Sequence, residues 1–491
     1  MRFSGHFLHN PLQNSGYTAV IRKASSKENH MKKFTVRDEI GYVCGDMAGS
    51  FVNLFVDAYF LTFCTYVLGI SAKWMGSLFL AARLWDAFND PMIGSFPDRW
   101  RLGKSGDKFK PYVKLFMIPL ALSGVLCFLD VSSWNLSGFA LHAWVAFVYV
   151  LYGMSYTGTS MPYGAMASVI TNDPIERSKL SRARSVGGTI VGVGALSVVP
   201  VFCFDKDSNI IPANFTMLAV VFGIGSLICY ILLTSLCTER VRDAAPQQKE
   251  KFNYAKILKN VTKNRPLIGV MVATVGSLLF ITGNSQLRTY IFKEYYENTS
   301  VMSVLSLSSI LVMIICFPLV PKLTKVFGKR KLILYSSIYS LVLYGFMLLV
   351  PIKNVWLYAV LTIIASIGQT VFTMLIWALV TDCLDYGEWV TGERNDGSMY
   401  SIYTFSRKIG STLASTIASF SLHAVGYVSG TNIVQAPEVV NSIRILVCAI
   451  PVITAVLEIV GIGLIFDLDK AKTDQMYEEL AARRQAAATN S

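Results

Sequence analysis

Apolar runs long enough to cross a membrane recur about twelve times along the chain when hydrophobicity is averaged over a sliding window. A transmembrane helix needs about 20 apolar residues, because the hydrocarbon core is about 30 Å thick and each helical residue rises 1.5 Å. Only 15% of the 491 residues are charged, and 53% are hydrophobic. The sequence therefore predicts an all-α membrane protein, with spans near residues 43–68, 74–96, 111–130, 140–164, 185–204, 215–236, 266–292, 301–321, 331–351, 355–380, 399–427 and 444–466.

The net charge of +13 is distributed unevenly along the chain. Lysine and arginine gather in alternate connections between the apolar runs, as the positive-inside rule describes for cytoplasmic loops. We therefore expect both termini in the cytoplasm, a bacterial inner membrane as the location, and membrane lipid rather than nucleic acid as the partner. The basic residues concerned are Arg99, Arg101, Lys104, Lys108, Lys110, Arg177, Lys179, Arg182, Arg184, Lys249, Lys251, Lys256, Lys259, Lys263, Lys322, Lys325, Lys329, Arg330 and Lys331.

A polar interval at residues 237–263, rich in Lys, Glu and Gln, separates six of the apolar runs from the other six. We expect a six-helix bundle at 37–236 and a second one at 264–467, joined by a cytoplasmic linker. Residues 1–36 are expected to form a disordered cytoplasmic leader, and residues 468–491 a cytoplasmic tail. Transporters of this build hold the substrate near the bilayer midplane between the halves and rock the halves to alternate access.

Two carboxylates and an amide interrupt the second apolar run. Asp86, Asn89 and Asp90 stand at i, i+3 and i+4, so their side chains project from one face of a helix. A charge at mid-bilayer costs about 2.5 to 3.5 kcal/mol on insertion scales, and the groups retained there mark ion or substrate paths. Their oxygens suit a small hard cation or a proton. The alternative is that Arg83, one turn earlier, neutralises a structural carboxylate.

The sequence around this cluster carries a family resemblance. The run Arg83–Pro91, followed by Gly94, Asp98 and Gly106–Tyr112, resembles the glycoside-pentoside-hexuronide:cation symporters, the group of melibiose permease within the major facilitator superfamily. The resemblance implies twelve transmembrane helices in two six-helix bundles and cation-coupled symport of a sugar or glycoside. It extends over nearly all of residues 37–467 through matches at Gly41-Tyr42, Gly45-Asp46, Tyr149–Thr157, Met161-Pro162-Tyr163, Asp382–Glu388 and Tyr403–Lys408.

The resemblance also implies a coupling-cation site. In that family two aspartates and an asparagine of the second span, with a threonine of the fourth, bind the cation. The corresponding residues here are Asp86, Asn89, Asp90 and Thr157, so all four residue types are present. Asp86 and Asp90 would hold the metal ion in a sodium-coupled protein. Na⁺ is favoured, H⁺ and Li⁺ stay open because carboxylates serve them too, and no other cofactor is expected.

The residues expected to contact the sugar depart from the melibiose pattern. Ser50 and Ser160 stand where melibiose permease has aspartates, and Gly164 stands where it has a tryptophan. Arg184 lies within one position of the family's fifth-span arginine, and Lys408 matches its eleventh-span lysine. A pocket that loses two negative charges and keeps two positive ones suits an anionic sugar, such as a hexuronide or a sulfonated sugar, which Arg can bind in bidentate fashion.

Both positive residues also have a structural interpretation. Lys408 would pair with Asp86 or Asp90 when the cation is absent, and Arg184 would extend to the cytoplasmic surface. Other candidates for the sugar path have packing as their alternative role; they are Asp57, Tyr156, Tyr163, Trp377 and Tyr403. Cytoplasmic ion pairs that gate the transporter are expected from Asp98, Arg99, Lys108 to Lys110, Asp382, Asp385, Glu388 and Arg394.

An enzyme is not expected, because the sequence contains neither a P-loop nor an H-E-x-x-H motif, and its five histidines lack metal-ligand spacing. A non-transporting sugar sensor on the same fold is one alternative, since it would keep the sugar pocket. A lysolipid transporter, as found among distant relatives of the family, is another.

Overall fold

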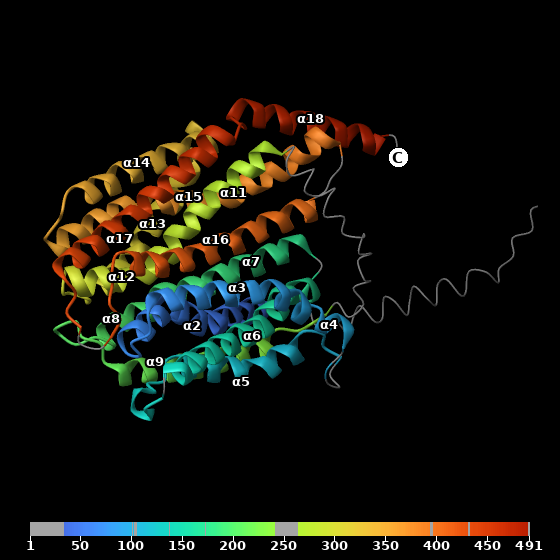
Figure 1. Ribbon diagram of the computed structural model, residues 1–491. Helices are drawn as coiled ribbons and strands as arrows, with labels where there is room; N and C mark the ends of the chain where they lie inside the picture. Colours follow the sequence, from blue (N-terminus) through green and yellow to red (C-terminus); the bar gives the residue numbers. More distant parts are fainter. Residues whose placement is uncertain are drawn as a thin grey trace, which may run out of the picture.

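The computed structural model describes residues 34–100, 102, 106–136, 138–171, 173–240, 264–392, 396–430 and 433–489. Within these residues the only β-structure is an isolated bridge between Phe204 and Ile210. Figure 1 shows long helices running alongside one another, with those of the first half of the chain on one side and those of the second half on the other. The prediction of an all-α protein is confirmed.

The first half of the chain supplies six spans, and prolines lie in the first turn of two of them. Pro111 and Pro212 occupy the first turns of the third and sixth spans, where a missing N–H leaves no intrahelical bond unmade. The spans are α2 (Val36–Tyr66), α3 (Ala72–Gly94), α5 (Lys110–Cys127), α6 (Gly138–Ile170), the composite span α7 (Pro174–Thr189), η2 (Ile190–Gly194), η3 (Ala195–Val198) and α8 (Val199–Phe202), and α9 (Pro212–Leu236); α4 (Phe96–Arg99) and η1 (Ser132–Trp134) lie in connections.

The second half supplies six more. Asn264 caps the first of them, its side chain accepting a hydrogen bond from Leu267 N at 3.0 Å, and Gly328, with φ +78°, separates the second from the third. The spans are the composite α11 (Arg265–Leu278), η4 (Leu279–Asn284), α12 (Ser285–Tyr290) and η5 (Ile291–Tyr295), then α13 (Val301–Phe327), α14 (Lys329–Leu349), α15 (Val355–Thr391), α16 (Asp396–Ala424), and α17 (Pro437–Glu458) with η6 (Ile459–Ile465); α18 (Lys470–Thr489) follows the last span.

Two of these twelve spans differ from the others in composition. Ten are long and apolar enough to cross a membrane by length and hydropathy, counting only the residues that the structure describes. The remaining two are α3 and α16. Helix α3 carries Arg83, Asp86 and Asp90, and helix α16 carries Arg407, Lys408 and many hydroxyl side chains. The two least apolar spans therefore contain three of the candidate cation ligands, Asp86, Asn89 and Asp90, and the candidate substrate residue Lys408.

The helix α15 extends beyond the apolar run that predicted it. The run ends near residue 380, whereas the helix continues to Thr391 and ends at Gly392, whose φ of +71° is left-handed. The extra turns contain polar residues, which end a hydrophobicity signal without breaking the backbone hydrogen bonds of a helix.

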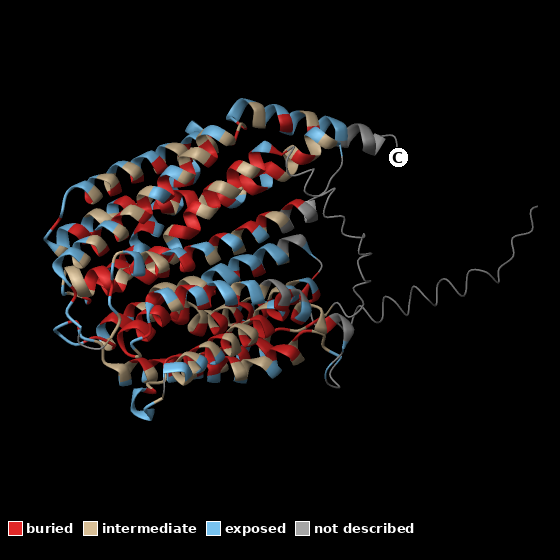
Figure 2. Ribbon diagram, viewed as in Figure 1, coloured by how far each residue is buried: buried red, intermediate tan, exposed pale blue. Residues whose placement is uncertain are grey.

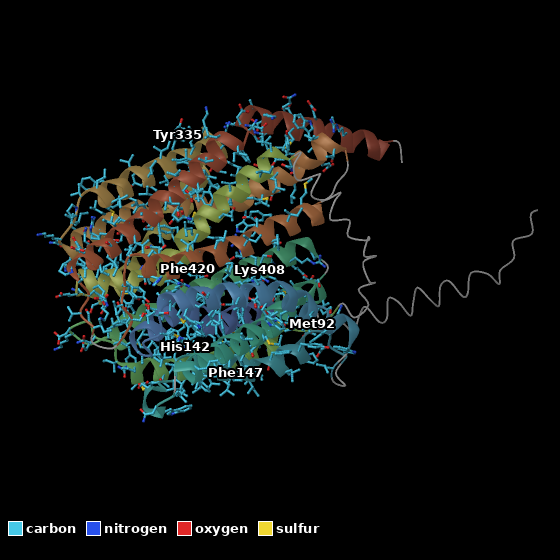
Figure 3. The ribbon with its side chains drawn as sticks, viewed as in Figure 1. Met92, His142, Phe147, Tyr335, Lys408 and Phe420 are labelled. Atoms are coloured by element: carbon cyan, nitrogen blue, oxygen red, sulfur yellow. The ribbon has the colours of Figure 1, made fainter. Side chains whose placement is uncertain are left out.

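The two bundles meet along three lines of contact. Helix α3 packs against α16, α2 packs against α12, and α13 packs against η2, η3 and α8. Gly76 on α3 lies against α16 so closely that an added Cβ would be 3.3 Å from the Phe420 ring. Lys408 and Phe420 both lie along α16 (Figure 3). The seam between α3 and α16 therefore brings residues from the two least apolar spans together.

The outward surface of the bundles is largely apolar. Exposed side chains include Leu115, Ile118, Leu122, Phe147 and Val342, each more than half exposed, and Figure 2 shows exposed residues along the outer helix faces with buried residues between helices. A surface of this kind suits contact with lipid rather than water.

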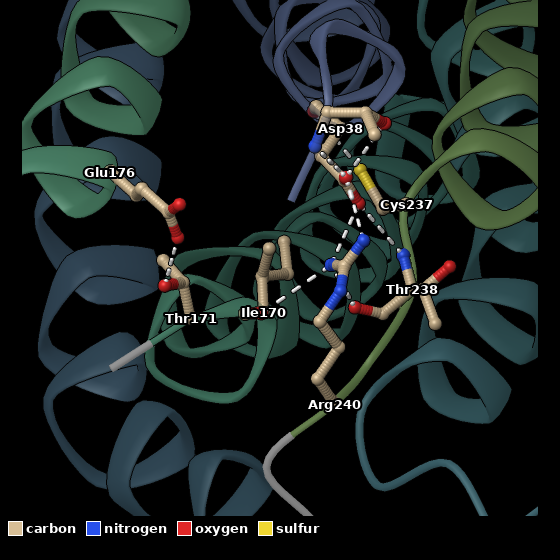
Figure 4. Close-up of polar contacts among 8 residues, drawn as sticks. Asp38, Ile170, Thr171, Glu176, Cys237, Thr238 and Arg240 are labelled. Carbon is tan, nitrogen blue, oxygen red and sulfur yellow. Dashed lines mark hydrogen bonds and ion pairs between the residues drawn. The ribbon is translucent and has the colours of Figure 1, made fainter. Parts of the chain in front are cut away.

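A polar cluster closes one end of the first bundle (Figure 4). Asp38, only 1% exposed at the start of α2, accepts hydrogen bonds from both terminal nitrogens of Arg240, at 3.0 and 2.8 Å. Next to Arg240, the carboxylate of Glu239 accepts the backbone N–H groups of Phe109 at 3.0 Å and Lys110 at 2.8 Å, which begin α5. Residues directly after α9 thus tie together the starts of α2 and α5.

Helix α11 and η6 approach so closely that only glycine fits. A Cβ at Gly461 would lie 2.5 Å from the carbonyl oxygen of Gly269, and the converse substitution gives the same distance. We predict that Gly461→Ala lowers the thermal stability of the purified protein, at a cost of about 1 to 3 kcal/mol for overpacking.

The matched control is Gly345→Ala on α14, where nothing lies within 4 Å of the added Cβ. That variant gains helix propensity and is expected to melt at or above the wild-type temperature. Differential scanning fluorimetry in detergent compares the two, and equal melting temperatures for both variants would contradict the packing argument.

Candidate functional site

Helix α3 presents its polar residues to α6 and to α16 of the other bundle. Asn89 and Asp90 are 1% and 7% exposed. Thr157 of α6 donates a hydrogen bond from Oγ1 to Asp90 Oδ1 at 2.8 Å, and Lys408 of α16 forms an ion pair with the other oxygen, Oδ2. Two of the predicted cation ligands and one predicted substrate residue thus meet at a single carboxylate.

Arg83 connects the two other carboxylates of this region. Its guanidinium lies 3.5 Å from Asp86 Oδ2 and 3.9 Å from Asp57 Oδ1. Asp57 also accepts a hydrogen bond from Asn53 Nδ2 at 3.1 Å, and Tyr152 donates to the amide oxygen of Asn53 at 2.8 Å. The predicted neutralisation of Asp86 by Arg83 is therefore present, and it extends to Asp57, which the sequence did not link to Arg83.

The charges of this cluster do not cancel. Asp57, Asp86 and Asp90 contribute three negative charges when ionised, and Arg83 and Lys408 contribute two positive ones, which leaves 3 − 2 = 1 negative charge. An uncompensated charge at membrane depth is expensive. One monovalent cation, or one proton, removes the excess.

Asn89 contributes a further unsatisfied group. Both Oδ1 and Nδ2 are buried without a hydrogen-bond partner in the described part of the chain. A buried polar group left unpaired costs about 1 to 3 kcal/mol, so its presence calls for an explanation. The carbonyl oxygen is a suitable ligand for a hard cation beside the two aspartates. Carboxylate, amide and hydroxyl oxygens together form a donor set that fits Na⁺ or Li⁺, whereas the described residues contain no group of three His, Cys, Asp or Glu side chains placed to hold a metal ion by themselves.

A small cavity of about 120 Å³ lies at this cluster. Predicted residues from both categories line it, namely Asp86, Asp90, Thr157, Tyr156, Ser160 and Lys408. The structure therefore brings three of the four expected cation ligands and part of the expected sugar residues to the same cavity.

The other predicted substrate residues lie elsewhere. Arg184 donates a hydrogen bond from Nε to Asp46 at 3.2 Å and lies over the Tyr163 ring. Trp377 is 44% exposed on α15, with Arg407 over its ring at 4.9 Å. Ser50 of α2 faces α7, where a Cβ at Gly188 would lie 3.9 Å from its hydroxyl, and Tyr403 packs edge-on against Trp377. None of these residues lines the small cavity.

Only some of the predicted gating residues lie in the described part of the chain. Asp382 accepts from Lys329 Nζ at 2.7 and 2.8 Å and from the Tyr477 hydroxyl at 2.6 Å, so its contacts lie within the second bundle and α18. Asp385 and Glu388 are half-buried on the same helix. Arg394 and the side chains of Asp98 and Arg99 lie outside the described residues, so their role in gating stays a prediction.

Tyrosines that the sequence did not single out join the bundles at the end of α2 opposite its start. The hydroxyls of Thr65 and Tyr290 lie 2.7 Å apart, and Tyr66 donates to Glu294 Oε1 at 2.7 Å. The Tyr427 ring packs against both Tyr66 and Tyr290. Aromatic residues in apolar spans are common, so only the tertiary contacts identify this cluster as a closure between bundles.

A second and larger cavity, of about 650 Å³, lies mainly in the second bundle. Its walls come from the α11–α12 span, α13, α14 and α15, and from Thr189 and Val193 of the first bundle. Arg288 lines it, together with Asn284 at the end of the π-helical segment η4. The sequence reading missed Arg288, although a charge inside the apolar run at 266–292 is a signal that would have found it.

Comparison with known proteins places these features in context. The family model described as "MFS/sugar transport protein" matches residues 41–470. The relative named "Uncharacterized symporter YjmB" of Bacillus subtilis is 30% identical over 94% of this chain and 99% of its own length. The "Glucuronide carrier protein homolog" of Escherichia coli is 27% identical over 84% and 89%, and the "Isoprimeverose transporter" of Lactiplantibacillus pentosus is 29% identical over 88% and 89%.

Solved structures confirm the fold. The inward open conformation of the xylose transporter XylE from E. coli aligns with a TM-score of 0.59 and 12% identity, covering 90% of this chain and 98% of that one. The chain thus has the twelve-helix major facilitator fold that the sequence predicts.

The pair of Lys408 and Asp90 yields a stability prediction. Removing Lys408 leaves the buried Asp90 carboxylate without its counter-charge; because the lysine side chain is 40% exposed, the cost is below the about 3 to 5 kcal/mol of a fully buried pair. Lys408→Gln should therefore lower the melting temperature of the purified protein in Na⁺-free buffer, and Asp90→Asn in the same chain should restore most of the loss. Melting temperatures of wild type, both single variants and the double variant form a double-mutant cycle. A double variant that melts below both single variants would contradict a direct pairing.

Proposed function

Because the chain belongs to the MFS/sugar transport protein family, we propose that it carries a sugar or glycoside across the membrane together with a monovalent cation. The two bundles rock about the central site and expose it to one side of the membrane at a time. The observation that carries the proposal is the cluster of Asp57, Asp86 and Asp90 with Arg83 and Lys408, which has one negative charge in excess.

The coupling ion occupies the oxygens of Asp86, Asp90, Asn89 and Thr157. An arriving cation competes with Lys408 for the Asp90 carboxylate. Displaced from Asp90, the Lys408 ammonium no longer joins α16 to α3, so the two bundles can rearrange around a sugar. Binding of the ion thus prepares the binding of the sugar, and by linkage the sugar tightens the ion site by the same factor.

For a neutral sugar, the membrane potential supplies the driving force. Moving one charge through the field is worth about 2.3 kcal/mol per 100 mV, which corresponds to a roughly 50-fold concentration of a neutral solute. An acidic sugar moving with one cation is electroneutral and depends instead on the ion gradient. Na⁺ is the proposed ion, with Li⁺ and H⁺ as the other ions that the same oxygens serve.

The orientation follows from the basic connections. We place the start of α2 and the connection after α9 in the cytoplasm of a bacterial cell, with the protein in its inner membrane. The positive-inside rule and the bacterial origin of the relatives support this placement. The tyrosine closure at Tyr66, Tyr290 and Tyr427 then seals the outer side, so the conformation is inward-facing.

Neutralising the acidic residues tests the coupling. We predict that Asp86→Asn and Asp90→Asn each reduce accumulation of labelled sugar in energised vesicles from many-fold to the external concentration, because the coupling ion loses a charged ligand. Uptake is measured under separate Na⁺, Li⁺ and pH gradients, with expression checked by immunoblot.

Asp130→Asn serves as the matched control, since Asp130 lies in the connection after α5 and, among the described residues, accepts a hydrogen bond from Ser132 N at 2.9 Å and makes no contact with the site. Undiminished accumulation by both site variants would exclude the coupling role. A wild-type protein that binds sugar but shows no ion-dependent counterflow would be a sensor, and one that moves lysolipid but no sugar would be a lysolipid transporter.

A further inference from the structure

Arg288 is a cation without a counter-charge inside a membrane span. It lies in α12, within the span from Arg265 to Tyr295, and its side chain lines the 650 Å³ cavity. Among the residues that the structure describes, its guanidinium has no hydrogen bond, ion pair or ring contact. A charge in this position is costly, and proteins keep such charges where a ligand or ion path uses them.

The other described arginines of the second half differ from Arg288 in this respect. Each has a partner: Arg265 donates to the Leu464 carbonyl, Arg330 to the Ile462 and Gly463 carbonyls, Arg407 lies over Trp377, Arg444 donates to Asn441, Met347 and Leu348, and Arg483 donates to the Trp389 carbonyl. Packing or snorkelling therefore accounts for those residues, and it leaves Arg288 unexplained.

The two cations assigned to an anionic sugar from the sequence are already compensated. Arg184 pairs with Asp46, and Lys408 pairs with Asp90. Lys408 becomes available only after a cation replaces it, whereas Arg288 is available throughout. Arg288 on α12 is therefore a better candidate for binding an anion than Arg184 or Lys408.

The cavity around Arg288 has the chemistry of a sugar site. Among the residues that the structure describes, no aspartate or glutamate lines it. Asn284, four residues before Arg288 on the same span, and Gln369 and Thr373 of α15 supply neutral hydrogen-bonding groups. Tyr344 contributes a buried hydroxyl that has no hydrogen-bond partner in the described chain. Apolar side chains cover the remaining walls and suit the C–H faces of a sugar ring; they include Phe280, Met313, Phe317 and Met374.

The position of the cavity connects the ligand to both bundles. Thr189 and Val193 belong to the α7–α8 span of the first bundle, whereas Arg288 and the other polar groups belong to the second. A ligand held by Arg288 also contacts the first bundle, so its binding energy can change the relative stability of the open and closed arrangements.

We propose that Arg288 binds the anionic group of the cargo and that the cargo is an acidic monosaccharide carrying a carboxylate or sulfonate. This proposal rests on the proposed transport function and names its substrate class. The planar guanidinium offers two parallel N–H donors to a carboxylate or sulfonate. Asn284, Gln369 and the Tyr344 hydroxyl then hydrogen-bond the ring hydroxyls.

Two ligands that differ at a single carbon test the assignment. Methyl β-glucuronide carries a carboxylate where methyl β-glucoside carries a hydroxymethyl group. Affinity of the purified full-length protein is measured by thermal shift and by isothermal titration calorimetry, with Na⁺ present and without a gradient. We expect wild type to bind the glucuronide and its sulfonated analogue more tightly than the glucoside.

Variants at Arg288 separate charge from shape. Arg288→Gln should weaken glucuronide binding about 10- to 150-fold, the loss expected for a hydrogen bond between charged groups, and leave glucoside binding within twofold. Arg288→Lys keeps the positive charge but lacks the two parallel N–H donors of the guanidinium. Its glucuronide affinity should lie between those of wild type and Arg288→Gln. Arg265→Gln, at the start of the same span and outside the cavity, is the matched control and should bind both ligands as wild type does.

Equal glucuronide affinity in wild type and both Arg288 variants would overturn the assignment and leave cation-coupled transport intact. Tighter binding of the glucoside by wild type would have the same meaning, with a neutral cargo. Protection by a lysophospholipid but by neither sugar would assign the guanidinium to a lipid phosphate, and it would overturn both this inference and the proposed sugar symport.

Discussion

The ion pair between Lys408 and Asp90 is the contact on which the arrangement of the site depends. It joins α16 of one bundle to α3 of the other, the two spans least suited to lipid by composition. Each of these helices would be costly in a membrane by itself, because its charges would lack partners. When α3 and α16 face each other, their opposite charges pair. The pair lies at the interface between the two bundles, which must change when the bundles rock. The same contact therefore stabilises the fold and restricts the motion.

The charges of the two halves are complementary around this contact. Among the described residues, the carboxylates that line the small cavity come from α3 and belong to the cluster with one negative charge in excess, whereas the large cavity has Arg288 and no acidic residue. A cation and an anionic solute thus have separate sites of the appropriate sign. Because Lys408 belongs to the second bundle and contacts the acidic site of the first, occupation of that site changes the balance between the bundles.

Much of the fold could be predicted from the sequence, because membrane spans are recognised by length and hydrophobicity alone. The twelve apolar runs correspond to twelve helical spans, although α15 continues beyond its run and the α11–α12 and α7–α8 spans contain π-helical and 3₁₀ segments. The spacing of Asp86, Asn89 and Asp90 placed them on one helix face, and the structure adds Thr157 from α6 to the same carboxylate. Arg288 was not singled out, because no motif accompanies it.

Local composition and a periodicity of 3.6 residues were enough to predict the helices and the carboxylates placed at membrane depth. Which charges meet could be learned from the packing of the spans alone. Arg83 lies between Asp57 and Asp86, Arg184 is paired with Asp46, Lys408 is paired with Asp90, and Arg288 faces a cavity. Pairing between spans depends on helix rotation and packing across residues far apart in the chain, and local sequence carries no direct record of either.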